Sequence, residues 1–194
     1  PKRSVDLPME APLCIIWDCD GTLIDTEKGS SDVIASIMES VKPGSREIEY
    51  KYHSSIIGMP TEMWVRKMME YAHIEGLIDP ADFANQYVNK MSVMSPQFKK
   101  IRGAESLTKF FKDHGVKQYM ATSTPRSLIG AKLAPHRDMI DRFDGIVTAD
   151  DVVHGKPAPD IFLKAAELAG VPPSRCIVFE DSPFGVQGGL AGGM

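Results

Sequence analysis

Two aspartates separated by a single residue follow an apolar segment near the start of the chain. Asp18 and Asp20 belong to the sequence DCDGT, which comes directly after the apolar residues 13–17. An apolar run before a glycine-containing turn predicts a buried parallel strand, and residues two apart in an extended chain project to the same side. Both carboxylates can therefore act on one atom. A pair of oxygen ligands of this kind suits Mg²⁺ and the phosphate chemistry that Mg²⁺ supports.

Two other interpretations of this motif need to be weighed. A calcium-binding loop of the EF-hand type would need a preceding helix and a glycine at its sixth position, whereas here a strand precedes and the glycine comes too early. An Asp-Gly pair can also be an ordinary turn. The ordinary turn stays possible for the motif taken alone, so the rest of the chain must decide.

Three further polar segments follow apolar runs later in the chain. Thr122 and Ser123 come after residues 117–121, Lys156 lies in GKPAPD, and Glu180 and Asp181 lie in FEDSP. The hydroxyl groups could bind a phosphate oxygen or only cap a helix. The lysine could neutralise phosphoryl charge or be an ordinary surface lysine. The two acids could complete a metal site or serve only as a helix cap.

These segments would be positioned by alternating strands and helices. Apolar runs predict strands at 13–17, 117–122, 145–148 and 176–179, and helical spacing of apolar residues predicts helices at 104–114 and 158–169. This alternation indicates an α/β fold with a doubly wound, Rossmann-like parallel sheet. Ligands of such sheets bind beyond the carboxyl ends of the strands, which is where the polar segments lie.

The segment from 27 to 101 interrupts this alternation. It contains no predicted strand, and apolar residues at helical spacing predict helices over 33–41, 60–74 and 80–94. We expect an all-helical cap domain at 27–101, linked near 25–31 and 95–103 to a catalytic core made of 11–26 and 102–194. Placed directly after the first strand, such an insertion would cover the cleft at Asp18 and Asp20.

Composition limits the classes of function. The 194 residues carry a formal net charge of −4, with 43% hydrophobic and 25% charged residues, which is typical of a globular protein. Without a basic excess, nucleic-acid binding is not expected, and the expected partner is a small phosphorylated metabolite. No apolar stretch has the length of a membrane helix. The three cysteines are predicted to be buried thiols of a cytoplasmic protein.

The ordered set of motifs resembles one family. DxDGT, a hydroxyl after the second core strand, GKPxPD and FEDSPxGVQ, with a helical insertion between the first two, resemble the haloacid dehalogenase-like phosphatases over almost the whole chain. Within them, the phrases IIGMP and VHGK resemble the beta-phosphoglucomutase-like branch with an alpha-helical cap. The resemblance implies an Mg²⁺-dependent phosphoric monoester hydrolase that acts on a sugar phosphate, a polyol phosphate or a nucleotide.

The resemblance also implies residue roles. Asp18 would attack phosphorus and form an aspartyl-phosphate, and Asp20 would exchange protons with the leaving group and with water. The Asp18 side chain, the Asp20 backbone carbonyl and Asp181 would bind the metal, with Glu180 as a further carboxylate. The groups expected to hold the phosphate are Gly21 with its neighbouring amides, Thr122, Ser123 and Lys156.

Three alternatives and one expectation remain. A beta-phosphoglucomutase-type mutase would place an arginine and a histidine where this chain has the uncharged Thr61 and Ser30, although Arg66 or Lys28 could reach in from a shifted register. A receiver-like signalling module would carry its acidic pair before the phosphorylated aspartate, without a helical insertion between them. A non-catalytic phosphate-binding protein is the third alternative.

Because relatives continue through another strand and helix, we expect the 194 residues to be a fragment. The sequence does not indicate an oligomeric state.

Overall fold

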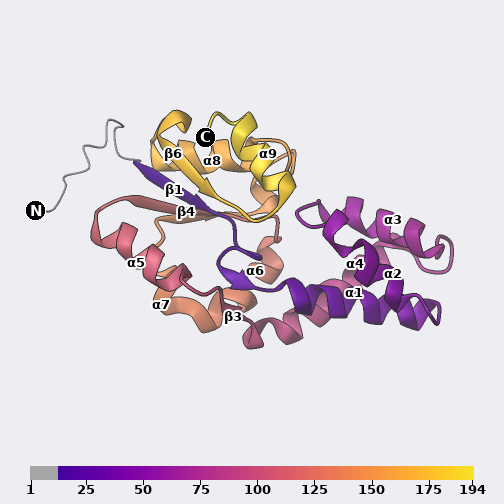
Figure 1. Ribbon diagram of the computed structural model, residues 1–194. Coiled ribbons are helices and arrows are strands. Elements are labelled where there is room, and N and C mark those ends of the chain that lie inside the picture. Colours follow the sequence, from indigo (N-terminus) through magenta and orange to yellow (C-terminus); the bar gives the residue numbers. More distant parts are fainter. Residues whose placement is uncertain (1–12) are drawn as a thin grey trace, which may run out of the picture.

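A parallel β-sheet forms the core of the fold. The computed structural model describes residues 13–194. In it, four strands pair in the order β5-β4-β1-β6, and Figure 1 shows β4, β1 and β6 side by side. All three pairings are parallel. The strands are β1 (Cys14–Trp17), β4 (Lys117–Ala121), β5 (Gly145–Val147) and β6 (Cys176–Phe179). The four predicted strands and the doubly wound α/β class are confirmed.

The strand order reverses beside β1. From β1 the chain proceeds to β4 and then β5 on one side, and it returns to β6 on the other side of β1. Open α/β sheets bind their ligands at the carboxyl ends of the strands next to such a reversal. Asp18 is the first residue after β1, so the sequence motif lies at the point where this fold class forms its sites.

Helices cover both faces of the sheet, as the alternation of side chains along β1 requires. Ile15 and Trp17 belong to a core cluster that includes residues of α5, where Trp17 contacts the ring of Phe111 edge to face at 6.1 Å. Cys14 and Ile16 point to the opposite face and belong to the cluster with α8. The helices of the core are α5 (Ala104–Asp113), α6 (Arg126–Leu133), α7 (Arg137–Ile140), α8 (Asp160–Ala169) and α9 (Pro183–Ala191).

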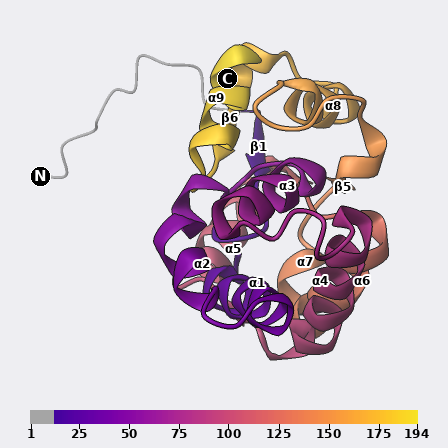
Figure 2. The ribbon, with the colours of Figure 1, turned by 90° about the vertical axis from the view of Figure 1, so that its right-hand side faces the viewer.

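The segment between the first strand and α5 is helical, as predicted. Figure 1 shows the helices of this segment at one side of the core, and in Figure 2 they face the viewer and lie in front of it. They are α1 (Glu27–Val41), α2 (Arg46–Tyr52), α3 (Thr61–Ala72) and α4 (Pro80–Met94). Pro80 occupies the first turn of α4, and the side chain of Asp79 caps that helix by accepting from the amide of Ala81 at 2.8 Å. We refer to residues 27–97 as the helical segment.

Several predicted boundaries are wrong. Residues 27–31, predicted as a linker, form the start of α1. The prediction missed them because the first turns of this helix are polar and show no apolar periodicity. The predicted absence of strands from 27–101 is also wrong: β3 (Lys99–Lys100) pairs antiparallel with β2 (Ile24–Asp25) and joins the two connections between core and helical segment. Two-residue strands are too short to leave a periodic pattern. The short helix α2 was not predicted.

Three further expectations concern the cysteines, a membrane helix and the division into domains. Cys14, Cys19 and Cys176 are buried free thiols, as predicted. Among residues 13–194, no helix is long and apolar enough to cross a membrane. The division into a core and a cap domain stays a prediction, and its first boundary, at residue 11, lies outside the described residues.

Candidate active site

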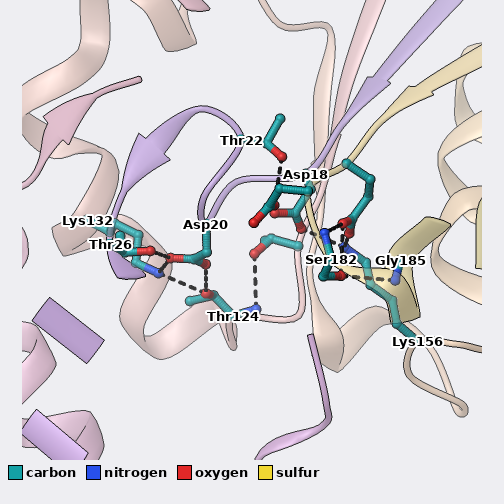
Figure 3. A network of polar contacts seen from close by, with 12 residues as sticks. Asp18, Asp20, Thr22, Thr26, Thr124, Lys132, Lys156, Ser182 and Gly185 are labelled. Carbon is teal, nitrogen blue, oxygen red and sulfur yellow. Dashed lines mark hydrogen bonds and ion pairs between the residues drawn. The ribbon is translucent and has the colours of Figure 1, made fainter. Parts of the chain in front are cut away.

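Asp18 lies in the centre of a charged network at the end of β1 (Figure 3). Its Oδ1 accepts a hydrogen bond from Lys156 Nζ at 2.5 Å, and the same ammonium group donates to Glu180 Oε1 at 2.5 Å. Lys156 is 2% exposed. The predicted alternative of a surface lysine is therefore wrong, because the GKP loop turns this side chain inward between two carboxylates from different strands.

Burial and neighbouring charge act on the Asp18 carboxyl group in opposite directions. Burial raises its pKa, Lys156 lowers it, and the carboxylates of Glu180 and Asp20 raise it again. Burial alone would lower the pKa of Lys156, but Asp18 and Glu180 outweigh this and raise it. The site therefore keeps a firmly protonated lysine between two acids, and it has more negative than positive charge.

A third carboxylate lies beside this pair. Ligand oxygens of Asp18, Glu180 and Asp181 all lie within 4.8 Å of one another. Asp181 accepts from Thr22 Oγ1 at 2.9 Å, which ties the loop after β6 to the loop after β1. Burial raises the pKa of Asp181, and Glu180 adds to that rise. Closely spaced, partly desolvated carboxylates of this kind are stabilised by a cation bound between them.

Glycine is required where these loops approach each other. Gly21 has φ = 81°, and a Cβ atom there would lie 2.1 Å from Asp181 Oδ2. At Gly185, in the first turn of α9, a Cβ atom would lie 1.8 Å from Glu180 Oε1. Glu180 is also fixed through Oε2, which accepts from the backbone nitrogen of Ser182 at 2.8 Å and from its hydroxyl at 2.9 Å. The backbone around the acidic cluster thus leaves no room for larger residues.

Asp20 has a separate set of partners. Its Oδ1 accepts from Thr26 Oγ1 at 2.8 Å and from Lys132 Nζ at 2.5 Å, and its Oδ2 accepts from Thr124 Oγ1 at 2.7 Å. Burial would raise the pKa of Asp20, but the charge of Lys132 and these hydrogen bonds outweigh it and lower the pKa. Figure 3 shows the two aspartates turned toward different lysines.

Lys132 was missed in the sequence, although a signal was available. It is 2% exposed and lies on the buried side of α6 with Leu128, Ile129 and Leu133. Lys132 follows Leu128 by four positions and Ile129 by three, so it interrupts the apolar face of the helix. A buried lysine requires a paired anion, so this interruption already indicated an acidic partner.

The residues predicted to hold the phosphate occupy different places. Ser123 lines the cleft described below, whereas Gly21 and Thr122 are not part of its lining. Thr122 is fully buried, and its Oγ1 accepts from the backbone nitrogen of Thr124 at 3.0 Å. It therefore shapes the turn that presents Ser123 and Thr124. A direct contact between Thr122 and phosphate stays a prediction.

A cleft opens between the core and the helical segment. Its core side includes Asp18, Asp20, Ser123, Lys156 and Glu180, so five of the predicted residues line one space. The helical segment supplies a different kind of surface, in which hydroxyl and apolar groups predominate. Its lining residues are Glu27, Ser30, Ile34, His53, Ile56, Ile57, Gly58, Met59, Thr61, Trp64, Tyr87 and Val88.

Comparisons with known proteins agree with this geometry. The family model of haloacid dehalogenase-like hydrolases matches residues 13–193. The probable pseudouridine-5'-phosphatase of Drosophila melanogaster is 34% identical, over 92% of this chain and 78% of its own length. The fructose-1-phosphate phosphatase YqaB of Escherichia coli is 30% identical, over 93% of this chain and 92% of its own length.

A solved structure extends the likeness to three dimensions. The crystal structure of a putative beta-phosphoglucomutase from Thermotoga maritima superposes with a TM-score of 0.70 at 31% identity, covering 93% of this chain and 82% of that one. The sheet, the helices on both its faces and the acidic loops at one edge thus define an α/β enzyme with its site at the strand ends. The chain belongs to the haloacid dehalogenase-like hydrolase family.

Proposed function

We propose that this chain hydrolyses a small phosphomonoester in two displacements, with Asp18 as the nucleophile. The observation that carries the proposal is the convergence of Asp18, Lys156, Glu180 and Asp181 at the end of β1. A carboxylate can act as a covalent nucleophile toward phosphorus, and the cationic lysine beside it can neutralise phosphoryl charge. The names of the two sequence relatives, both phosphatases, support the same reaction. The similar solved structure is named as a putative beta-phosphoglucomutase, so the mutase alternative needs a test of its own.

In the first displacement, an Asp18 carboxylate oxygen forms a bond to phosphorus while the bond from phosphorus to the ester oxygen breaks. The leaving oxygen receives a proton from the Asp20 carboxyl group. Because Lys132 holds the pKa of Asp20 low, Asp20 must take up this proton when the substrate binds, before the ester bond breaks. In later turnovers, the proton that Asp20 takes from water serves the same purpose. The products are an aspartyl-phosphate and the free alcohol.

In the second displacement, Asp20 acts as the base. Its carboxylate takes a proton from a water molecule, whose oxygen bonds to phosphorus as the bond to Asp18 breaks. This releases inorganic phosphate and regenerates both aspartates. The low pKa of Asp20 suits this half of the reaction, because the ionised form is the one that accepts a proton.

The acidic cluster fits a magnesium ion. Asp18, Glu180 and Asp181 offer carboxylate oxygens, the hard donors that Mg²⁺ prefers, and their excess negative charge is only partly offset by Lys156. When bound, the ion would supply positive charge next to the phosphoryl oxygens. The Asp20 backbone carbonyl, predicted as a ligand, lies on the same loop. Ser123 on the cleft wall would add a hydrogen bond to a phosphoryl oxygen.

The first experiment measures phosphate release. The parent protein with Mg²⁺ should release inorganic phosphate from p-nitrophenyl phosphate with repeated turnover, and an excess of chelator should abolish this. Asp18→Asn keeps the shape of the side chain but loses its charge, and it should remove turnover. Asp20→Asn should lower turnover by about 100- to 10,000-fold, the usual contribution of acid–base transfer. Circular dichroism should show both variants folded.

Three outcomes would contradict the proposal. Activity near the parent level in Asp18→Asn would reject the nucleophile. The mass of the protein after incubation with a phosphate ester separates the other two. One bound phosphoryl group per chain without repeated phosphate release would favour the receiver-like module, and neither a bound phosphoryl group nor released phosphate would favour the non-catalytic binding protein. Each alternative thus has its own readout.

A further inference from the structure

The wall of the cleft contributed by the helical segment holds a charged triad. His53, just after α2, lies between two glutamates: its Nδ1 is 2.5 Å from Glu49 Oε1, and its Nε2 is 3.1 Å from Glu27 Oε2. Glu49 is fully buried, and its other oxygen accepts from Ser31 Oγ at 2.6 Å. Glu27 begins α1, directly after Thr26, which binds Asp20. The triad therefore adjoins the reacting groups.

The hydrogen bonds within the triad leave one carboxylate oxygen, Oε1 of Glu27, available as an acceptor. Both ring nitrogens of His53 face carboxylates, so both donate and the ring is an imidazolium; burial lowers the pKa of His53, but the bonds to Glu27 and Glu49 outweigh it and raise the pKa to about 9. Glu49 has a partner on each oxygen. Glu27 has a partner on Oε2 only, and within residues 13–194 its Oε1 has no hydrogen-bond partner. The Glu27 side chain is 34% exposed and lines the cleft.

The surroundings define what can bind this acceptor. A hydroxyl pair, Ser30 Oγ and Tyr87 Oη, 2.9 Å apart, lines the same wall, and the indole of Trp64 packs edge to face on Tyr87 at 4.9 Å. Among the described residues of the helical segment, His53 is the one cation in the lining, and two carboxylates already neutralise it. An anionic leaving group would therefore meet net negative charge and no free cation.

We infer that Glu27, held in place by His53, binds a hydroxyl group of the alcohol portion of the substrate. The alcohol portion of the substrate is then neutral and carries a hydroxyl group within reach of Glu27. This contact selects among the polyol, sugar and nucleotide phosphates that the family resemblance already implies. This inference rests on the proposed function. A carboxylate with a free acceptor selects a hydroxyl donor strongly, because without one it would be desolvated and unpaired.

The test uses pairs of esters that differ by one hydroxyl group. The parent protein is assayed with glycerol 1-phosphate against 3-hydroxypropyl phosphate, which lacks only the 2-hydroxyl group, and with ribose 5-phosphate against 2-deoxyribose 5-phosphate. A further assay uses p-nitrophenyl phosphate, which has no aliphatic hydroxyl. At least one hydroxylated ester should be hydrolysed with a kcat/KM about 10- to 100-fold above that of its partner. The pair of esters with the larger ratio of kcat/KM values identifies which hydroxyl group is bound. Equal kcat/KM values within both pairs would overturn the inference whatever the variants do.

Variants then assign the preference to Glu27. Glu27→Gln should lower kcat/KM for the preferred ester about 10- to 100-fold more than it lowers kcat/KM for the partner ester or for p-nitrophenyl phosphate. His53→Gln should act on the preferred ester mainly by raising its KM. Glu62→Gln, an exposed carboxylate of α3 that does not line the cleft, is the matched control. A preference that survives Glu27→Gln, or an equal loss on every ester, would refute the role of Glu27. No hydrolysis of any ester by the parent would refute the proposed function itself.

Discussion

Asp18 and Asp20 are two residues apart, yet their surroundings shift their pKa values in opposite directions. Burial raises the pKa of Asp18 against the opposing charge of Lys156, whereas Lys132 and two threonine hydroxyls lower that of Asp20 despite burial. Two carboxylates on one short loop can therefore take different roles because each has its own lysine. This separation suits a reaction in which one carboxylate forms a covalent bond and the other moves protons.

Replacing Lys132 should impair proton transfer by Asp20 while leaving the aspartate itself in place. In Lys132→Met the buried methylene stem is largely kept, but Asp20 loses its charged partner and the bond that orients it. We expect turnover of p-nitrophenyl phosphate to fall about 10- to 100-fold. The matched control is Lys164→Met on α8, where the lysine is exposed and pairs only with the exposed Glu167. Turnover that is equal in the two variants would show that Lys132 has no part in catalysis.

The sequence predicts the acidic residues of the site better than their partners. The Asp18–Asp20 pair could be recognised because its spacing, the preceding strand and the turn are all local. The partner of Asp20, Lys132, is 112 positions away along the chain. Its buried position was readable from the apolar face of α6, but which carboxylate it meets depends on how the sheet and helices pack.

At the scale of the elements, the strands and their loops determine the distances between the charges. The four core strands were predictable because buried parallel strands are continuous apolar runs. The two-residue pair β2–β3 and the short helix α2 were not, because neither is long enough for a period to appear. Yet β2–β3 ties together both connections to the helical segment, and α2 carries Glu49 of the triad.

A methyl group at Gly185 should disturb the acidic cluster through α9. A Cβ atom there would lie 1.8 Å from Glu180 Oε1, so Glu180 must move away from Lys156. Gly185→Ala should therefore lower turnover about tenfold or more, since displacements of about 1 Å are costly at an active site. Gly130→Ala, inside α6 with no atom within 4 Å of the added Cβ, should keep activity and stabilise the fold by about 0.5–1 kcal/mol. Equal activity of the two variants would contradict this account of Gly185.

The junction of α1 and α2 should make stability depend on pH. His53 has its pKa raised from 6.5 to about 9 by Glu27 and Glu49, so the folded state holds its proton more tightly than the unfolded state does. The stabilisation is fully present below pH 6.5 and is lost as the pH rises to about 9, with an upper limit of roughly 3 kcal/mol. The difference in free energy of unfolding between parent and His53→Gln, measured with urea, should shrink from pH 6 to pH 10. A constant difference would mean that folding does not raise the pKa of His53.

At the scale of the whole molecule, the cleft lies between two parts with different tasks. Both parts line the cleft. In the proposed reaction the core supplies the groups that react with the phosphoryl group, and the helical segment supplies the wall that meets the alcohol portion of the substrate. Conserving a phosphoryl group for transfer back to a sugar would need that wall to bind a second phosphate. Charge-assisted contacts from arginine, lysine or protonated histidine are the usual means.

The structure places uncharged residues where a mutase would need these contacts. Ser30 and Thr61 both line the cleft. The two cations that could have supplied the missing charge, Lys28 and Arg66, do not line the cleft. Lys28 is 85% exposed and pairs with Asp32 at 2.6 Å. Arg66 lies exposed on α3. The aspartyl-phosphate would thus react with water rather than wait for a reoriented sugar bisphosphate.

We therefore expect hydrolysis and not isomerisation of hexose phosphates. The assay supplies beta-glucose 1-phosphate with its bisphosphate activator and Mg²⁺, and it follows glucose 6-phosphate by coupled oxidation and inorganic phosphate in parallel samples. Phosphate should appear without glucose 6-phosphate. Introducing the missing charge in Thr61→Arg should slow phosphate release from the bisphosphate by retaining it in the cleft. Efficient formation of glucose 6-phosphate by the parent protein, with little phosphate released, would show that a wall without a free cation does not prevent reorientation and that the chain acts as a mutase.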